Sequence, residues 1–153
     1  MLYELALVAI TSMLPVSELR GGIPLGIALG LPPELAILTS IAANTLVFFP
    51  VYFGLELFYE RFFSKWKFSR KIVERSKKKA GPYLDKYGIL GLAVFIGIPL
   101  PATGVWTGTL IAWLFGLDWK KSFLAAFLGV LMAAAIVSAI VLGFLAGLGF
   151  LVG

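Results

Sequence analysis

The sequence contains no cysteine and no histidine, and charged residues make up only 14% of its 153 positions. Without cysteine there is no disulfide and no thiol chemistry. Without histidine the usual zinc sites and the histidine-dependent forms of nucleophilic catalysis are excluded. No cluster of acidic residues takes their place. We therefore expect a protein that is not an enzyme, has no metal site and uses no cofactor.

Hydrophobic residues, by contrast, account for 60% of the chain, whereas about 45–50% is usual for soluble domains. A chain of this length forms one compact bundle, and nothing indicates a separate soluble domain. The apolar segments are helical in composition. The sequence therefore predicts an all-α integral membrane protein.

The net charge of +5 comes from one region of the chain. Ten of the 13 basic residues lie between Arg61 and Lys86, in a connector between apolar segments. Basic loops stay on the cytoplasmic side of a membrane, and this rule explains the charge without a nucleic-acid partner. Aromatic residues recur in the connector at helical spacing, which predicts an amphipathic helix on an anionic lipid surface. Gly81-Pro82 is expected to end that helix.

The segment Glu18–Pro24 interrupts the first apolar third of the chain with an acid, a base, two glycines and a proline. The apolar stretches on either side of it are shorter than the roughly 20 residues that cross a bilayer. Two short apolar pieces joined by such a break predict a re-entrant helical hairpin over residues 2–31, which enters and leaves the membrane on one face. A transmembrane helix is then expected over residues 34–58, with a kink at Pro50.

The same order of elements follows the connector. A second re-entrant hairpin is predicted over residues 87–116, with its break at Pro99–Gly104, and a second transmembrane helix over residues 119–152, capped by Asp118. The predicted division of the chain is a first repeat, a basic amphipathic connector and a second repeat, which cover residues 1–58, 59–86 and 87–153.

The two repeats can be aligned at their glycines. Gly21 is laid on Gly104, and Gly30-Leu31 on Gly116-Leu117, with three extra residues in the second copy. The identity is weak, but the order of elements repeats. Because each repeat carries the chain once across the membrane, the two repeats are expected to be inverted relative to each other.

The basic residues set the expected orientation. The connector and the Lys120-Lys121 pair fall on one side of the membrane, and Pro32-Pro33 and the C-terminus fall on the other. The positive-inside rule then predicts a multi-pass plasma-membrane protein with a cytoplasmic connector and both termini outside. A chain with five crossings would also group the basic loops, but three of its spans would have only about 12–15 residues, against about 20 needed.

Glu18 and Arg20 are the candidate functional residues of the first hairpin. A charge at the hydrocarbon centre costs about 2.5–3.5 kcal/mol and usually faces protein or a water-filled cavity. Arg20 has a donor fork suited to phosphate or carboxylate, and Gly21 and Gly22 allow backbone N–H groups to turn toward the same point. A helix N-terminus after Pro24 would add its positive dipole. These features predict an anion-binding substrate site.

The second hairpin could complete this site with Thr103, Thr107 and the N–H groups near Gly104, since inverted hairpin tips commonly meet near the midplane. Glu18 is the candidate for proton coupling, because burial disfavours its charged form whereas pairing with Arg20 favours it. A substrate that takes Arg20 away would then trigger protonation. The alternative is a static bridge that only holds the turn.

Asn44 is the supporting polar residue of the predicted helix over residues 34–58. It lies four residues from Ser40 and therefore on the same helix face, and an amide in lipid needs a partner. We expect Asn44 to brace the hairpin, and substrate contact is the alternative.

The segments Glu18–Pro24 and Gly97–Gly108 resemble those of the small multidrug export protein family, and the resemblance covers essentially the whole chain. That family is similar to the DedA, or VTT-like, superfamily. The resemblance implies two inverted re-entrant hairpins and, for some superfamily members, proton-linked movement of polyprenyl-phosphate carriers or scrambling of phospholipids. The superfamily's Arg-Phe-x-Pro pattern is replaced here by Pro101–Gly104, so a second anion-binding arginine is not implied.

Three functions remain open. The first is a transporter or lipid flippase that moves an anionic amphiphile, such as a polyprenyl phosphate or a phospholipid. The second is drug export by proton antiport, although Arg20 beside Glu18 opposes the binding of a cationic drug. The third is a membrane protein without transport, either a scaffold or an enzyme that acts on lipid, although no histidine, cysteine or acidic cluster supports catalysis. The expected partners are membrane lipid, an anionic lipid or small amphiphilic substrate, and a second copy of the chain, because two hairpins and two spans make thin walls.

Overall fold

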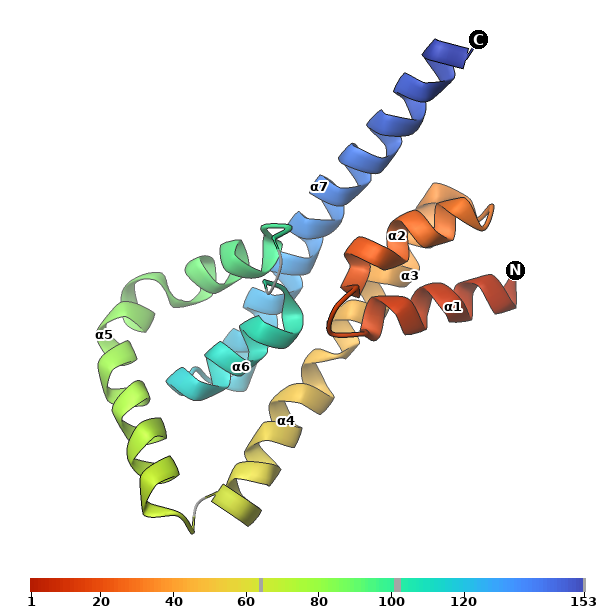
Figure 1. Ribbon diagram of the computed structural model, residues 1–153. Coiled ribbons are helices and arrows are strands. Elements are labelled where there is room, and N and C mark those ends of the chain that lie inside the picture. Colours follow the sequence, from red (N-terminus) through yellow and green to blue (C-terminus); the bar gives the residue numbers. More distant parts are fainter. Residues whose placement is uncertain (64, 101–102, 153) are drawn as a thin grey trace.

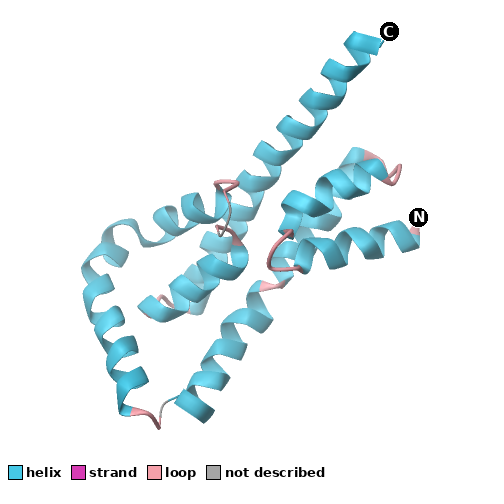
Figure 2. Cartoon of the chain, in the orientation of Figure 1, coloured by secondary structure: helices cyan, strands magenta, loops and turns pink. Residues whose placement is uncertain are grey.

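The computed structural model describes residues 1–63, 65–100 and 103–152, which are almost entirely helical (Figure 1, Figure 2). The helices, in chain order, are α1 (Leu2–Met13), α2 (Glu18–Ala28), α3 (Pro33–Leu46), α4 (Phe48–Phe58), the π-helical turn η1 (Tyr59–Phe63), α5 (Lys67–Gly97), α6 (Val105–Phe115) and α7 (Trp119–Val152). These described ranges contain no strand. The prediction of an all-helical chain is confirmed.

Two helical segments among the described residues are long and apolar enough to cross a membrane. They are Pro33–Phe62, which is made of α3, α4 and most of η1, and Trp119–Phe150 within α7. At 1.5 Å per residue both exceed the ~30 Å hydrocarbon core. The helix is interrupted at Val47, because Pro50 has no N–H to donate to the carbonyl of Leu46. The kink predicted from Pro50 is confirmed.

The helices α1 and α2 are joined by a turn over residues 14–17. Leu14 is extended, with φ −71° and ψ 140°, because the proline that follows it disfavours helical geometry. The segment Glu18–Pro24 therefore lies after the turn and forms the first part of α2. The expectation that this segment is itself the turn, with a new helix N-terminus after Pro24, is wrong. Pro24 is accommodated inside α2.

The helices α2 and α6 end with the same hydrogen-bond pattern. Gly30 has φ +84° and Gly116 has φ +76°, in the left-handed region that glycine adopts without strain. Each glycine N–H donates to the carbonyl three residues earlier, at 3.0 Å in both helices. The N–H of the next residue, Leu31 or Leu117, donates to the carbonyl five residues earlier, at 3.0 and 2.9 Å. Gly30-Leu31 and Gly116-Leu117 thus make matching helix caps.

The basic connector continues into the second hairpin as one helix. α5 runs from Lys67 to Gly97, so the prediction that Gly81-Pro82 ends the connector helix is wrong. Figure 1 shows α5 bending along its length before it reaches α6 and α7. Pro82 is the one proline of α5, and a proline inside a helix removes a backbone donor and bends the helix. The expected connector and the first arm of the hairpin are therefore two parts of one bent helix.

The two halves of the chain pack against each other through their membrane spans and through the second helix of each hairpin, α2 in the first hairpin and α6 in the second. α2 lies against α7, α6 lies against α4, and α3 lies against α7. In Figure 1 the α1–α2 turn and the α5–α6 connection both face the centre of the molecule. The residues buried there include Leu19, Ile23, Phe48, Ile96 and Val105. The centre is therefore where the two hairpins meet.

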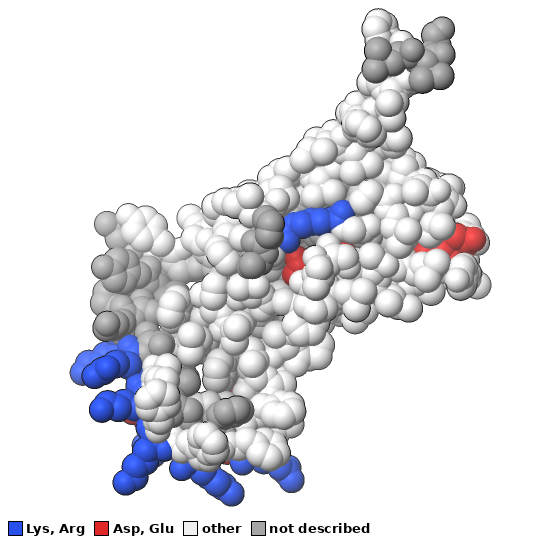
Figure 3. Space-filling model, viewed as in Figure 1, with Lys and Arg blue, Asp and Glu red and all other residues white. Residues whose placement is uncertain are grey.

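Charged side chains are separated along the molecule. Figure 3 shows basic residues gathered at one end and acidic residues at the opposite end, with a basic and an acidic group together at the centre of this face. The basic end consists of η1 and the first part of α5, where Arg61, Lys67 and Arg70 are exposed. The surface between the two ends is mostly uncharged in this view. This distribution is typical of a protein that crosses a bilayer.

Candidate functional site

Arg20 reaches from α2 to the end of α5. Its Nη1 donates to the carbonyl of Thr103 at 2.7 Å, and its Nη2 donates to the carbonyl of Ile98 and the hydroxyl of Thr103, both at 3.0 Å. A longer contact, 3.4 Å, joins Nη2 to the carbonyl of Ile96. Ile96 and Ile98 lie at the C-terminus of α5, where the helix dipole is negative. The guanidinium therefore caps the end of α5.

Glu18 is directed at the start of α6. The side chain is buried, 4% exposed, and its Oε1 accepts a hydrogen bond of 3.4 Å from the backbone N–H of Trp106. The first N–H groups of a helix have no partner within the helix and carry the positive end of its dipole. The carboxylate therefore caps the start of α6. Its Oε2 lies 3.4 Å from Nη1 of Arg20.

The Glu18–Arg20 pair thus bridges the two hairpins. Glu18 caps the positive N-terminal end of α6, and Arg20 caps the negative C-terminal end of α5. Both helix ends lie at the break in the second hairpin. The bridge that the sequence predicts within a single turn is present, and it also holds the opposite hairpin. Most of the Arg20 donors predicted for an anion are bound to main-chain oxygens in this conformation.

The backbone at Gly104 is where Glu18 and the second hairpin meet most closely. Gly104 has φ +126°, and a Cβ built there would collide with the carboxylate of Glu18. Glu18 has φ +48° and is the one non-glycine residue with positive φ in the part of the chain that the structure describes. That conformation costs on the order of 1–3 kcal/mol, and such strain clusters at functional sites. We call this meeting point of Glu18 and Arg20 with Ile96, Ile98, Thr103, Gly104 and Trp106 the junction. It is a candidate functional site.

Gly21 and Gly22 lie inside α2, where they allow close packing. A Cβ on Gly22 would lie 2.8 Å from Oγ of Ser40 and would collide with Oγ of Ser12. A Cβ on Gly21 would lie 2.8 Å from Cβ of Ser17, and the Gly21 N–H donates to the Ser17 carbonyl at 3.0 Å. In this conformation the structure does not turn the Gly21 N–H toward the Arg20 side chain.

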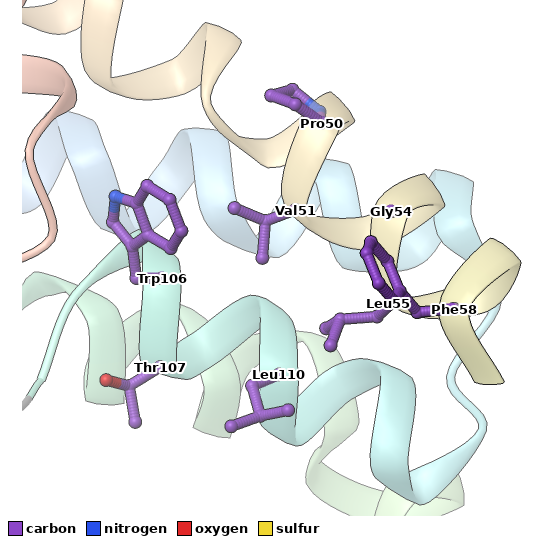
Figure 4. Close-up of a pocket in the computed structure, with 8 residues that line it drawn as sticks. All are labelled: Pro50, Val51, Gly54, Leu55, Phe58, Trp106, Thr107 and Leu110. Atoms are coloured by element: carbon purple, nitrogen blue, oxygen red, sulfur yellow. The ribbon is translucent and has the colours of Figure 1, made fainter. Parts of the chain in front are cut away.

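Thr103 and Thr107 have different positions. Thr103 contacts Arg20, whereas Thr107 lies on α6 at the edge of a groove between α4 and α6 (Figure 4), which we call the α4/α6 groove. The groove has a volume of about 400 Å³ and is lined by Pro50, Val51, Gly54, Leu55, Phe58, Trp106, Thr107 and Leu110. Trp106 directs its indole N–H to the carbonyl of Met13 at 3.0 Å. The α4/α6 groove is therefore almost wholly apolar.

A second groove of similar volume, about 380 Å³, lies between α2 and α7, and we call it the α2/α7 groove. It is lined by Pro24, Ile27, Ala28, Ile140, Val141, Phe144 and Leu145. All of these side chains are apolar. Neither groove can be predicted from the sequence, because each is made from segments that are far apart in the chain and whose residues indicate only apolar helix.

Asn44 lies in α3 and is 1% exposed. Its Nδ2 donates to the carbonyl of Ser12 in the last turn of α1, at 2.8 Å. It lines neither of the two grooves. In this conformation Asn44 joins the first span to the first hairpin. Pro101 and Ala102, which belong to the motif that departs from the superfamily pattern, lie outside the described residues.

The apolar spans, the broken second hairpin and the buried charge pair define a helical membrane protein. Residues 18–136 match the model of one protein family, whose description is "Putative small multi-drug export protein". The match covers more than half of the chain, so the chain belongs to this family, and the predicted resemblance to it is confirmed. The matched region begins at Glu18 and includes the whole junction. No curated protein and no solved structure matches the chain.

Proposed function

We propose that this protein exports small amphiphilic molecules, in keeping with the description of its family. The observation that carries the proposal is the junction, where buried Glu18 and its partner Arg20 close onto both ends of the break in the second hairpin. Ionisable residues at such depth usually mark a transport pathway. The two apolar grooves beside the junction supply the surface that an amphiphile needs.

We also propose that the halves are inverted repeats, each with a re-entrant hairpin and one span. The matching caps at Gly30 and Gly116 support this proposal. The positive-φ residues Glu18 and Gly104 each lie 12 residues before their capping glycine. One shift of 86 residues therefore relates both pairs, without the three extra residues expected from laying Gly21 on Gly104. The same shift places α2 on α6 and α4 on part of α7. The contact between α2 and α7 therefore corresponds to the contact between α6 and α4.

In this arrangement the two repeats rock against each other around the junction, as inverted-repeat transporters do. The basic end is placed in the cytoplasm by the positive-inside rule, with both termini outside. The α4/α6 groove, which ends at Phe58 next to η1, then lies toward the cytoplasm. The α2/α7 groove lies toward the outside, nearer the C-terminus.

Glu18 is proposed to carry the proton that drives export. In the charged form its carboxylate pairs with Arg20 and caps α6. Protonation removes that charge, which weakens both contacts and releases the start of α6 from the first hairpin, while Arg20 keeps its hydrogen bonds to Ile98 and Thr103. Release of the proton on the other side of the membrane restores the charged Glu18–Arg20 pair and closes the junction. The proton is thus exchanged for substrate at one carboxylate.

One observation favours a second candidate, the movement of an anionic amphiphile such as a polyprenyl phosphate or a phospholipid. The Nε of Arg20 is buried and has no hydrogen-bond partner among the described residues. An anionic headgroup would find one donor there. It would have to displace main-chain carbonyls to reach the others, and we therefore place this candidate second.

The test is transport by purified protein in vesicles with an acidic interior. We expect a cationic drug to accumulate inside together with proton release, and Glu18→Gln to abolish both. Glu34→Gln is the matched control, because Glu34 is an exposed acid at the outer end. Movement of fluorescent phospholipid without drug-dependent proton flux would replace the proposal by the second candidate. Folded protein that moves neither probe would indicate a scaffold.

A further inference from the structure

The two apolar grooves are built from equivalent positions in the two halves of the chain. The shift of 86 residues that relates Glu18 to Gly104 also relates lining residues of one groove to lining residues of the other. Four pairs coincide, namely Pro24 with Leu110, Gly54 with Ile140, Leu55 with Val141, and Phe58 with Phe144. The helix caps set this shift without reference to the grooves, so the agreement does not come from the choice of alignment.

The chemistry of both grooves points to an apolar ligand. Their volumes, about 400 and 380 Å³, fall within the range of about 300–1,000 Å³ that is usual for small-molecule sites. Thr107 supplies the one side-chain hydroxyl of the α4/α6 groove, and the α2/α7 groove has none. A charged group in either groove would have no counter-charge and would lose its hydration. Because α4 and α7 belong to the membrane spans, such a ligand can enter from the lipid.

We propose that the two grooves are two sites for the same ligand, the uncharged apolar part of the exported amphiphile. This inference rests on the proposed export function and specifies its substrate class. The ligand occupies the α4/α6 groove when the path is open to the cytoplasm and the α2/α7 groove when it is open to the outside. Any charged end of the molecule stays at the rim of the groove.

The junction lies between the two sites and contributes to the walls of both. Trp106 lines the α4/α6 groove, and its backbone N–H is capped by Glu18. Pro24 lines the α2/α7 groove and follows Glu18 by six residues on the same helix, about 9 Å along its axis. A movement of Glu18 away from α6 therefore shifts one wall of each groove together.

Gly54 and Ala28 allow the grooves to be filled one at a time. Gly54 lines the α4/α6 groove, and a Cβ built there meets no atom within 4 Å, so a larger side chain has room to begin at this position. Ala28 is exposed and lines the α2/α7 groove. Gly147 also has open space around its Cβ position and lines neither groove. Gly54→Phe and Ala28→Phe are thus the test variants, and Gly147→Phe is the matched control.

The experiment is photolabelling of the full chain in vesicles with an uncharged aryl-diazirine hydrocarbon, with the adducts mapped by mass spectrometry. We expect labelling in both grooves to saturate with probe concentration. Gly54→Phe should remove it from the α4/α6 groove only, and Ala28→Phe from the α2/α7 groove only. Gly147→Phe should leave both unchanged.

Several outcomes would overturn the inference. Leu124 and Leu128 of α7 are exposed, and their labelling is expected to rise linearly with probe concentration. The same linear rise in the grooves would mean that the grooves hold only bulk lipid. Saturation in one groove alone would refute the pair, and cross-links between two chains at the grooves would assign them to a dimer interface. Saturable labelling of both grooves without transport in vesicles would refute the export function while the two binding sites would stand. Transport without saturable labelling would refute the two binding sites while the export function would stand.

Discussion

Replacing Arg20 by methionine should destabilise the protein strongly, and replacing Glu18 by glutamine in the same chain should restore part of that loss. Methionine keeps an aliphatic side chain and removes the guanidinium, which donates at 2.7 and 3.0 Å to two carbonyls of the second hairpin. It also leaves Glu18, 4% exposed, without its counter-charge. Arg20 is 21% exposed, so the loss should fall somewhat below the roughly 3–5 kcal/mol that breaking a fully buried pair costs.

Glu18→Gln alone should cost less, about 1–2 kcal/mol, because the amide oxygen can still accept the hydrogen bond from the Trp106 N–H. In the Arg20→Met background the same change removes an uncompensated buried charge. The double variant should therefore be more stable than Arg20→Met by roughly 1–3 kcal/mol, the usual cost of a buried polar group left without its partner. The effects of the two substitutions are then far from additive, as is usual for residues in contact.

The assay is unfolding by SDS in mixed micelles, followed by tryptophan fluorescence at neutral pH. Arg70→Met is the matched control, because Arg70 has a shorter ion pair with Glu74, 2.9 Å, but both side chains are more than 60% exposed. It should leave the free energy of unfolding nearly unchanged, because solvent screens a pair this exposed. Additive effects of the two junction substitutions, or an equal loss in the control, would refute the assignment of the pair to the hairpin contact.

Three further predictions follow from other parts of the structure. Gly104→Ala should cost about 1–3 kcal/mol and weaken the junction, because a methyl group collides with the carboxylate of Glu18 there. Gly30→Ala is the control in the same SDS titration, because it has open space and should show only the cost of a positive φ in alanine. Asn44→Leu should lower stability by about 1–3 kcal/mol, since it leaves a buried carbonyl without its donor; an altered substrate affinity at unchanged stability would instead indicate ligand contact. Single cysteines at Lys71 and Leu29, both exposed in a chain without native cysteine, should react with a membrane-impermeant maleimide from inside and outside respectively, and reaction of both from one side would refute the inverted topology.

The lengths of the apolar segments and the prolines between them were enough to predict an all-helical chain and its two candidate spans. The predicted cap of the last helix is present, since Oδ2 of Asp118 accepts a hydrogen bond of 3.1 Å from the N–H of Lys120. The first turn was misplaced because glycine and proline indicate turns only statistically. Gly22 instead serves close contact with Ser12 and Ser40, which depends on neighbours that no local pattern reveals.

The partners of Glu18 and Arg20 could not be predicted from neighbouring residues in the sequence either. Arg20 was singled out as a donor for an anionic substrate, whereas in this conformation it donates to main-chain carbonyls more than 70 residues away in the sequence. The useful signal was the break at Pro99–Gly104, because an interrupted helix leaves one positive and one negative end that require charges. The contact between Glu18 and Trp106 could have been inferred only by pairing that break with the acid and base of α2.

The close approach of Glu18 to Gly104 limits how alike the two repeats can become. These residues hold equivalent places in the two halves, and the side chain of one fills the space above the other. A second glutamate at position 104 could not fit, because even a Cβ there collides with the carboxylate of Glu18. In the mechanism that we propose, the junction therefore holds a single carboxylate, and export is limited to one proton for each cycle.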